Sequence, residues 1–75
     1  MENPYDDTWD AGDAGCGDLV LGLRQKLRAM PGKILRVVSE DAGAPEDIPA
    51  FCRMTGDILL GHDRQRHVYW IKARD

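Results

Sequence analysis

The sequence has few cysteines, few aromatic residues and no long apolar run. Its 75 residues include two cysteines and one phenylalanine, and no apolar run approaches the roughly 18 residues needed to cross a bilayer. Two cysteines are too few for a disulfide framework. A domain of this length hides only about 60% of the surface of its unfolded chain, so it cannot enclose a large ligand and also keep a core. We expect one domain that carries about one reactive atom, at its surface.

Basic residues are absent before Arg24, and the N-terminus has no apolar stretch of the kind found in secretory signals. We therefore expect a cytoplasmic protein whose thiols stay reduced. With 43% hydrophobic residues and a net charge of -3, the composition is that of a folded chain. We expect residues 1–7 to form a flexible acidic N-terminus and residues 8–75 to form a single domain.

Charge is divided along the chain. All ionisable residues up to Asp18 are acidic, and from Arg24 to Arg36 all are basic. Acids favour the start of a helix and bases its end, so a solvated helix with complementary charges explains most of this pattern. A basic docking patch for a partner, formed by Arg24 and Arg28, is the alternative.

Hydrophobic periodicity predicts two helices. Apolar residues recur at helical spacing over residues 18–30, with Asp18 as the N-cap. A second helix is expected over residues 48–55, with Asp47 as its N-cap. This boundary places Pro49 in the first turn, where its missing N–H costs nothing.

The remaining apolar segments predict strands near residues 8–10, 33–39, 58–60 and 68–71. The resulting order β-α-β-α-β-β predicts an α+β fold, a two-layer α/β sandwich with both helices on one face of a mixed four-stranded sheet. The order of the strands within the sheet does not follow from the sequence.

Cys16 is the strongest candidate for chemistry, because it lies just before the first predicted helix. Backbone N–H groups at a helix start favour a thiolate, and Gly15 and Gly17 would leave the sulfur accessible. The carboxylates of Asp10, Asp13 and Asp18 are close in sequence and oppose this effect by raising the pKa of the thiol. A helix terminus contributes about 0.3 to 1 kcal/mol, less than one pKa unit, so the sequence does not decide which effect wins.

Cys52 lies on the apolar stripe of the second predicted helix, which is typical of a core thiol. A role as a resolving thiol opposite Cys16 is the lesser alternative. A zinc site formed by both cysteines with His62 and His67 fails on spacing, because the cysteines are far apart in sequence. We expect no metal and no organic cofactor.

One face of the sheet is expected to be open. If Leu35 and Val37 point into the core, Arg36 points outward, and the same alternation on the last strand turns Trp70 and Lys72 outward. A basic and aromatic face suits a protein-docking adaptor, and less well a binder of single-stranded nucleic acid, since the pI is near 5.2. An ordinary solvated sheet face is the simplest interpretation.

Several segments together resemble the TusA/SirA-like family of small sulfur carriers. They are Asp10-Ala11, the single cysteine that opens the first helix, and the segment from Asp47 to Cys52, which reads Asp-Ile-Pro-Ala-Phe-Cys. The similarity extends from about Trp9 to Lys72. It implies the β-α-β-α-β-β sandwich, a persulfide carried on Cys16, and protein partners that donate and accept sulfur, such as a cysteine desulfurase.

The sequence diverges from this family directly after the cysteine. Where the family has Cys-Pro-x-Pro, this chain has Cys16-Gly17-Asp18-Leu19. We expect a monomeric, divergent sulfur carrier that relays a persulfide sulfur between protein partners. The alternative is a non-catalytic adaptor or regulatory module of the same fold that uses the open sheet face.

Overall fold

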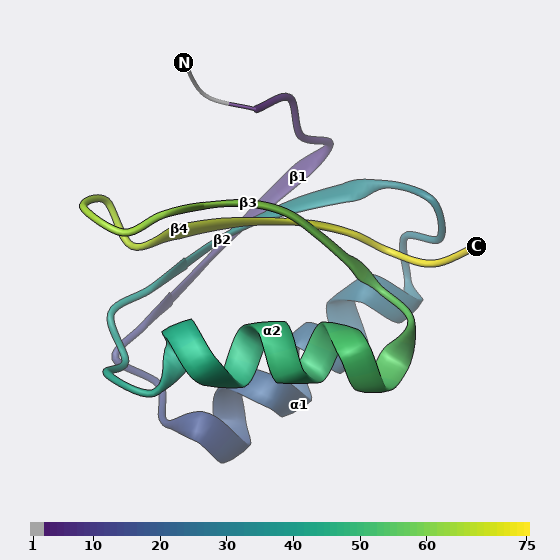
Figure 1. Ribbon diagram of the computed structural model, residues 1–75. Helices are drawn as coiled ribbons and strands as arrows, with labels where there is room; N and C mark the ends of the chain where they lie inside the picture. The colour runs from purple at the N-terminus through teal and green to yellow at the C-terminus, as the bar shows by residue number, and fades with distance from the viewer. Residues whose placement is uncertain (1–2) are drawn as a thin grey trace.

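The computed structural model describes residues 3–75, except for the side chain of Cys16. Over this range the chain forms one sheet of four strands, and two helices pack on one of its faces (Figure 1). The elements in chain order are β1 (Asp7–Gly12), α1 (Cys16–Arg28), β2 (Ile34–Ser39), α2 (Ala44–Thr55), β3 (Ile58–Asp63) and β4 (Val68–Lys72). The predicted fold class and element order are confirmed.

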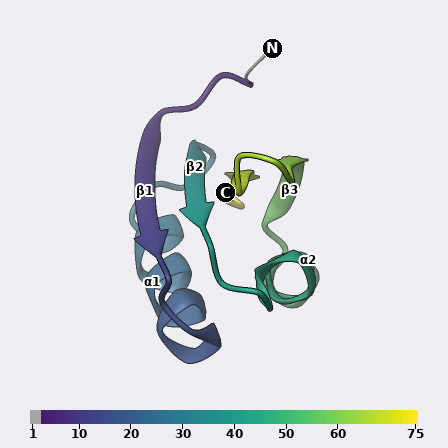
Figure 2. The same ribbon diagram turned by 90° about the vertical axis from the view of Figure 1, so that its left-hand side faces the viewer.

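The order of the strands is β1-β2-β4-β3. β1 pairs with β2 in parallel, whereas β4 is antiparallel to both β2 and β3, so the sheet is mixed as expected. Figure 2 shows α1 alongside β1 and β2 and α2 end-on beside β3. This arrangement brings the end of β1, the start of α1 and the start of α2 to the same end of the molecule.

The core lies between the sheet and the helix layer. Leu19, Leu23 and Leu27 on α1 meet the inward side chains of β2, Leu35 and Val37, and all five are buried. Complete burial of such a side chain contributes about 1.5–3 kcal/mol to folding. These are the residues whose helical and alternating spacing indicated a buried face.

A glycine allows α1 to approach β1 closely. A Cβ on Gly22 would overlap the indole ring of Trp9, whose Cζ2 atom would be 2.8 Å away. The ammonium group of Lys26 lies 5.5 Å from the centroid of the same ring. Trp9 is therefore held between the sheet and α1 rather than exposed at the sheet edge.

α1 begins two residues earlier than predicted. Gly15, in an extended conformation, is its N-cap, and Asp18 lies inside the first turn, so the expected capping role of Asp18 is wrong. The first helical hydrogen bond runs from the N–H of Leu19 to the carbonyl of Gly15 at 2.8 Å. An acid inside the first turn still interacts favourably with the helix dipole, which explains why the pattern resembled a cap.

α2 also begins earlier than predicted, at Ala44 with Gly43 as its N-cap, so Asp47 is not the cap. Asp41 organises this start, because its carboxylate accepts the N–H of Gly43 at 3.0 Å and its carbonyl accepts the N–H of Ala44 at 3.1 Å. Pro49 consequently lies within the helix rather than in its first turn. Across residues 3–75, no helix has the length and apolar character needed to cross a membrane.

Candidate functional site

The site suggested by the sequence is the loop and helix start around Cys16. β1 ends at Gly12, whose φ of 57° is strained for any residue with a side chain, and a turn closes with the N–H of Ala14 bonded to the carbonyl of Ala11 at 3.1 Å. Cys16 follows as the first residue of α1. Its backbone therefore lies among the N–H groups that carry the positive end of the helix dipole.

The four residues expected to support Cys16 all lie at this end of the molecule. Asp10 accepts the N–H of Gly12 at 2.9 Å and so holds the turn after β1. Gly15 is the N-cap and has no side chain to occupy the first N–H groups, while Gly17 and Asp18 are exposed in the first turn. The side chain of Cys16 is outside the described part of the structure, so the reactivity of its sulfur stays a prediction.

Cys52 is in a different environment. It belongs to the core cluster and is 5% exposed, which confirms its interpretation as a core thiol. Burial, with the Asp57 carboxylate as a further contribution, raises the pKa of the Cys52 thiol from 9.0 to about 11. At neutral pH this thiol is protonated, and only the thiolate is a nucleophile.

The raised pKa of Cys52 predicts a loss of stability in alkali. The unfolded chain releases this proton near pH 9, whereas the folded protein keeps it up to about pH 11. The folded state therefore binds more protons in this window, and stability falls as the pH rises through it. Urea unfolding of the wild type and Cys52→Ala from pH 8 to 11 should show the wild type losing stability relative to the variant. Parallel pH profiles would contradict this expectation.

Among the described side chains, which do not include that of Cys16, the two histidines share no metal site with a cysteine. The ring of His62 stacks on that of Tyr69, with centroids 4.0 Å apart, and burial together with the Arg64 charge lowers the pKa of His62. His67 lies in the turn between β3 and β4 with a φ of 60°. Among the described residues, no group of three or more His, Cys, Asp or Glu side chains is arranged to hold a metal ion.

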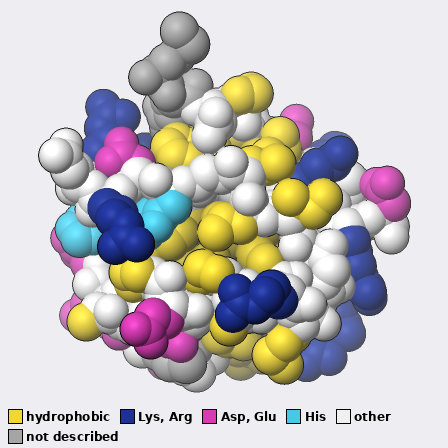
Figure 3. Space-filling model, in the orientation of Figure 1, with side chains coloured by type: hydrophobic (Ala, Val, Ile, Leu, Met, Phe, Trp, Pro, Cys, Tyr) yellow, Lys and Arg dark blue, Asp and Glu magenta, His cyan; other side chains and the backbone are white. Residues whose placement is uncertain are grey.

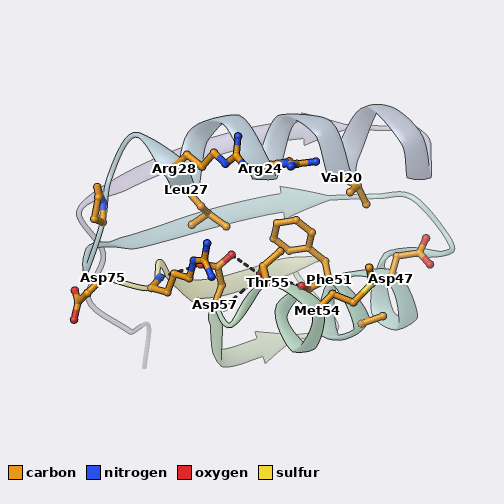
Figure 4. A pocket seen from close by; sticks show the side chains of 13 residues that line it. Val20, Arg24, Leu27, Arg28, Asp47, Phe51, Met54, Thr55, Asp57 and Asp75 are labelled. Atoms are coloured by element: carbon orange, nitrogen blue, oxygen red, sulfur yellow. Dashed lines mark hydrogen bonds between the residues drawn. The ribbon is translucent and has the colours of Figure 1, made fainter.

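A groove of about 650 Å³ lies between α1 and α2 (Figure 4). Arg24 and Arg28 border it from α1, and Phe51 and Met54 border it from α2. Met54 is 87% exposed, although it is an apolar residue. The sequence indicated the two arginines but not Met54, because the relative placement of two helices does not follow from the periodicity of either.

The expectation of an open sheet face is wrong for Trp70. Strand register pairs Trp70 with Arg36 on the side away from the helices, as predicted, but Trp70 is only 5% exposed. Arg36 lies 5.7 Å from the ring of Tyr5 and donates to the hydroxyl of Thr8 at 3.4 Å. Lys72 is exposed. Trp70 is therefore not available as the aromatic docking side chain that the adaptor and nucleic-acid alternatives assigned to this face.

Comparison with known proteins places the chain in a family. No family model matches it. A sulfur carrier protein TusA of Pseudomonas paraeruginosa is 32% identical over 99% of this chain and 98% of its own, and that of Pseudomonas fluorescens is 35% identical over 95% and 89%. A putative sulfur carrier protein of Neisseria meningitidis serogroup A is 38% identical over 84% of this chain and 86% of its own. The chain belongs to the TusA-like family of sulfur carrier proteins.

Proposed function

We propose that this protein accepts a persulfide sulfur on Cys16 and relays it to a protein partner. The observation that carries the proposal is the contrast between the two cysteines. Cys16 is the first residue of α1, whereas Cys52 is buried and has a raised pKa. Membership of a sulfur carrier family supports a role for a thiol, and the contrast favours Cys16 as that thiol.

The chemistry is two thiol–disulfide exchange steps. The Cys16 thiolate attacks the outer sulfur of a donor persulfide, the donor S–S bond breaks, and the donor leaves as a thiolate. A thiolate of the acceptor then attacks the terminal sulfur of the Cys16 persulfide and releases the Cys16 thiolate. The sulfur atom moves without net oxidation or reduction, so the relay uses no further cofactor. A compartment that keeps thiols reduced, the cytoplasm, suits this exchange.

A direct experiment tests acceptance and relay. The reduced protein is incubated with a cysteine desulfurase and cysteine, and its intact mass is measured without reductant. We expect a gain of one sulfur atom, and loss of that sulfur when the separated carrier is given an acceptor thiol protein. A mass that does not change in the first step contradicts acceptance, and a stable added sulfur in the second contradicts relay.

We further propose that the groove between α1 and α2 docks the sulfur donor. Exposed Arg24 and Arg28 on the α1 side and exposed Met54 on the α2 side suit a partner that places carboxylates against α1 and an apolar side chain against α2. The groove is also lined by Asp47, Asp57 and Asp75, so this charge complementarity concerns its α1 side. Reversing both charges, Arg24→Glu with Arg28→Glu, should weaken binding of the desulfurase by about tenfold, or about 1.4 kcal/mol. Calorimetric titration measures this change.

A matched control separates docking from net charge. Lys33→Glu with Arg66→Glu changes the net charge by the same amount at two exposed positions that do not line the groove. This variant should bind the desulfurase within about twofold of the wild type at physiological salt, because distant exposed charges are screened. Equal weakening by both double variants would show that long-range charge, and not the groove, determines binding.

A further inference from the structure

The chain's own N-terminal segment, residues 3–6, lies over part of the outer face of the sheet. In Figure 1 this segment leaves β1 and runs above the sheet, on the side opposite the helices. Two hydrogen bonds attach its base to β2. The N–H of Asp6 donates to the carbonyl of Ile34 at 2.8 Å, and the Asp6 carboxylate accepts the N–H of Ile34 at 2.8 Å.

The segment then crosses towards the opposite edge of the sheet. Tyr5 lies against Arg36 of β2, with 5.7 Å between the ring centroid and the guanidinium carbon. Asn3 reaches β3, where its side-chain nitrogen would be 2.6 Å from a Cβ on Gly61. The missing side chain of Gly61 thus makes room for Asn3 beside the ring of Trp70, whose Cε3 atom would be 3.4 Å from the same Cβ.

Trp70 is buried on this face, beside Gly61 and the side chain of Asn3. The indole N–H of Trp70 has no hydrogen-bond partner among the described residues, although the side chain is 5% exposed. A buried donor without an acceptor destabilises this closed arrangement. When residues 3–6 move away, water accepts a hydrogen bond from this N–H and removes the penalty. Hydrophobic side chains gather in the middle of the face shown in Figure 3. On β3, the side chains of Ile58 and Leu60 are exposed.

We propose that residues 3–6 form a strap that opens and closes over Trp70 on the outer face of the sheet. The strap contacts the sheet through Asp6 on β2, Tyr5 on Arg36 and Asn3 beside Gly61. Opening exposes Trp70 of β4, and the neighbouring strand β3 already carries the exposed side chains of Ile58 and Leu60. The inference does not depend on the sulfur chemistry of Cys16.

Gly61→Ala tests the strap in the full-length protein. The new methyl group displaces the flexible end of Asn3 and leaves the core unchanged, since Gly61 faces away from the helices beside Trp70. Hydrogen exchange of the Trp70 indole N–H, measured by nitrogen-15 NMR and assigned with a Trp70→Phe spectrum, reports the opening. We expect exchange at least tenfold faster in Gly61→Ala than in the wild type.

Two further variants keep the test independent of any change in β3. Tyr5→Ala and Asn3→Ala alter the strap alone and should accelerate the same exchange, whereas Gly17→Ala, at a position where no described atom lies within 4 Å of the added methyl group, should not. Exchange in the wild type as fast as in the three strap variants would show that the strap is not closed in solution and would overturn the proposal. Sulfur loading of the three strap variants, Gly61→Ala, Tyr5→Ala and Asn3→Ala, should match that of the wild type, because the strap and the start of α1 are on different sides of the sheet.

Discussion

A Cys16→Ser variant is expected to gain no sulfur in the presence of a desulfurase and cysteine, whereas Cys52→Ser should load to the level of the wild type. A serine hydroxyl cannot attack a persulfide under these conditions, because it is almost entirely protonated and forms no S–S bond. The buried Cys52 thiol, with a pKa of about 11, contributes no thiolate at neutral pH. We therefore expect complete loss of sulfur loading in Cys16→Ser and no change in Cys52→Ser, measured by intact mass.

The paired design also separates reactivity from folding. Both variants replace a sulfur by an oxygen. Only the substitution at Cys52 is known to place the hydroxyl in the buried core, where it destabilises packing. Circular dichroism and the urea midpoint establish that Cys16→Ser is folded. Equal loading of Cys16→Ser and the wild type would contradict a carrier role for Cys16, and loss of loading only in a folded Cys52→Ser would assign the sulfur to the other thiol.

Gly22→Ala is expected to destabilise the fold by about 1–3 kcal/mol, the range for overpacking a well-packed core. The added methyl group has to occupy space that the ring of Trp9 already fills, and Trp9 is held by β1 and by Lys26. Relief requires either that the indole ring of Trp9 moves or that α1 separates from β1, which opens the core contacts of Leu19 and Leu23. Urea unfolding measures the loss.

Gly17→Ala in the same helix serves as the matched control. No described atom lies within 4 Å of a Cβ at this position, and the residue is helical and exposed. Replacing glycine by alanine there should stabilise the protein by about 0.5–1 kcal/mol, because it restricts the unfolded chain and favours the helix. A similar change in stability for both variants would contradict the close contact between Gly22 and Trp9.

Much of the fold could be predicted because local patterns determine it. The spacing of Leu19, Leu23 and Leu27 identifies the buried side of α1, and alternation in β2 identifies Leu35 and Val37. Helix starts were less predictable, since an acid within the first turn resembles a cap and since the turn at Asp41 begins α2 a full turn early. The strand order depends on long-range pairing, which no local pattern encodes.

Some features of the candidate site could be predicted from the sequence, and others could not. The position of Cys16 at a helix start follows from local sequence, and the comparisons confirm the family that the sequence resembled. The alternation of β4 correctly turned Trp70 away from the helices but could not reveal what covers it. Residues 3–6, which are distant in sequence, contact β2 and approach β3 on that side of the sheet. The groove beside Met54 likewise arises only when two helices pack together.

The most direct test of the central claim is the location of the transferred sulfur. After loading, free thiols and persulfides are alkylated, the protein is digested with trypsin, and the fragments are sequenced by tandem mass spectrometry. Cleavage after Arg24 yields a fragment with Cys16, and cleavage after Arg36 and Arg53 yields one with Cys52. We predict the additional sulfur on the Cys16 fragment and none on the Cys52 fragment. Additional sulfur on Cys52, or on neither fragment, would contradict the account.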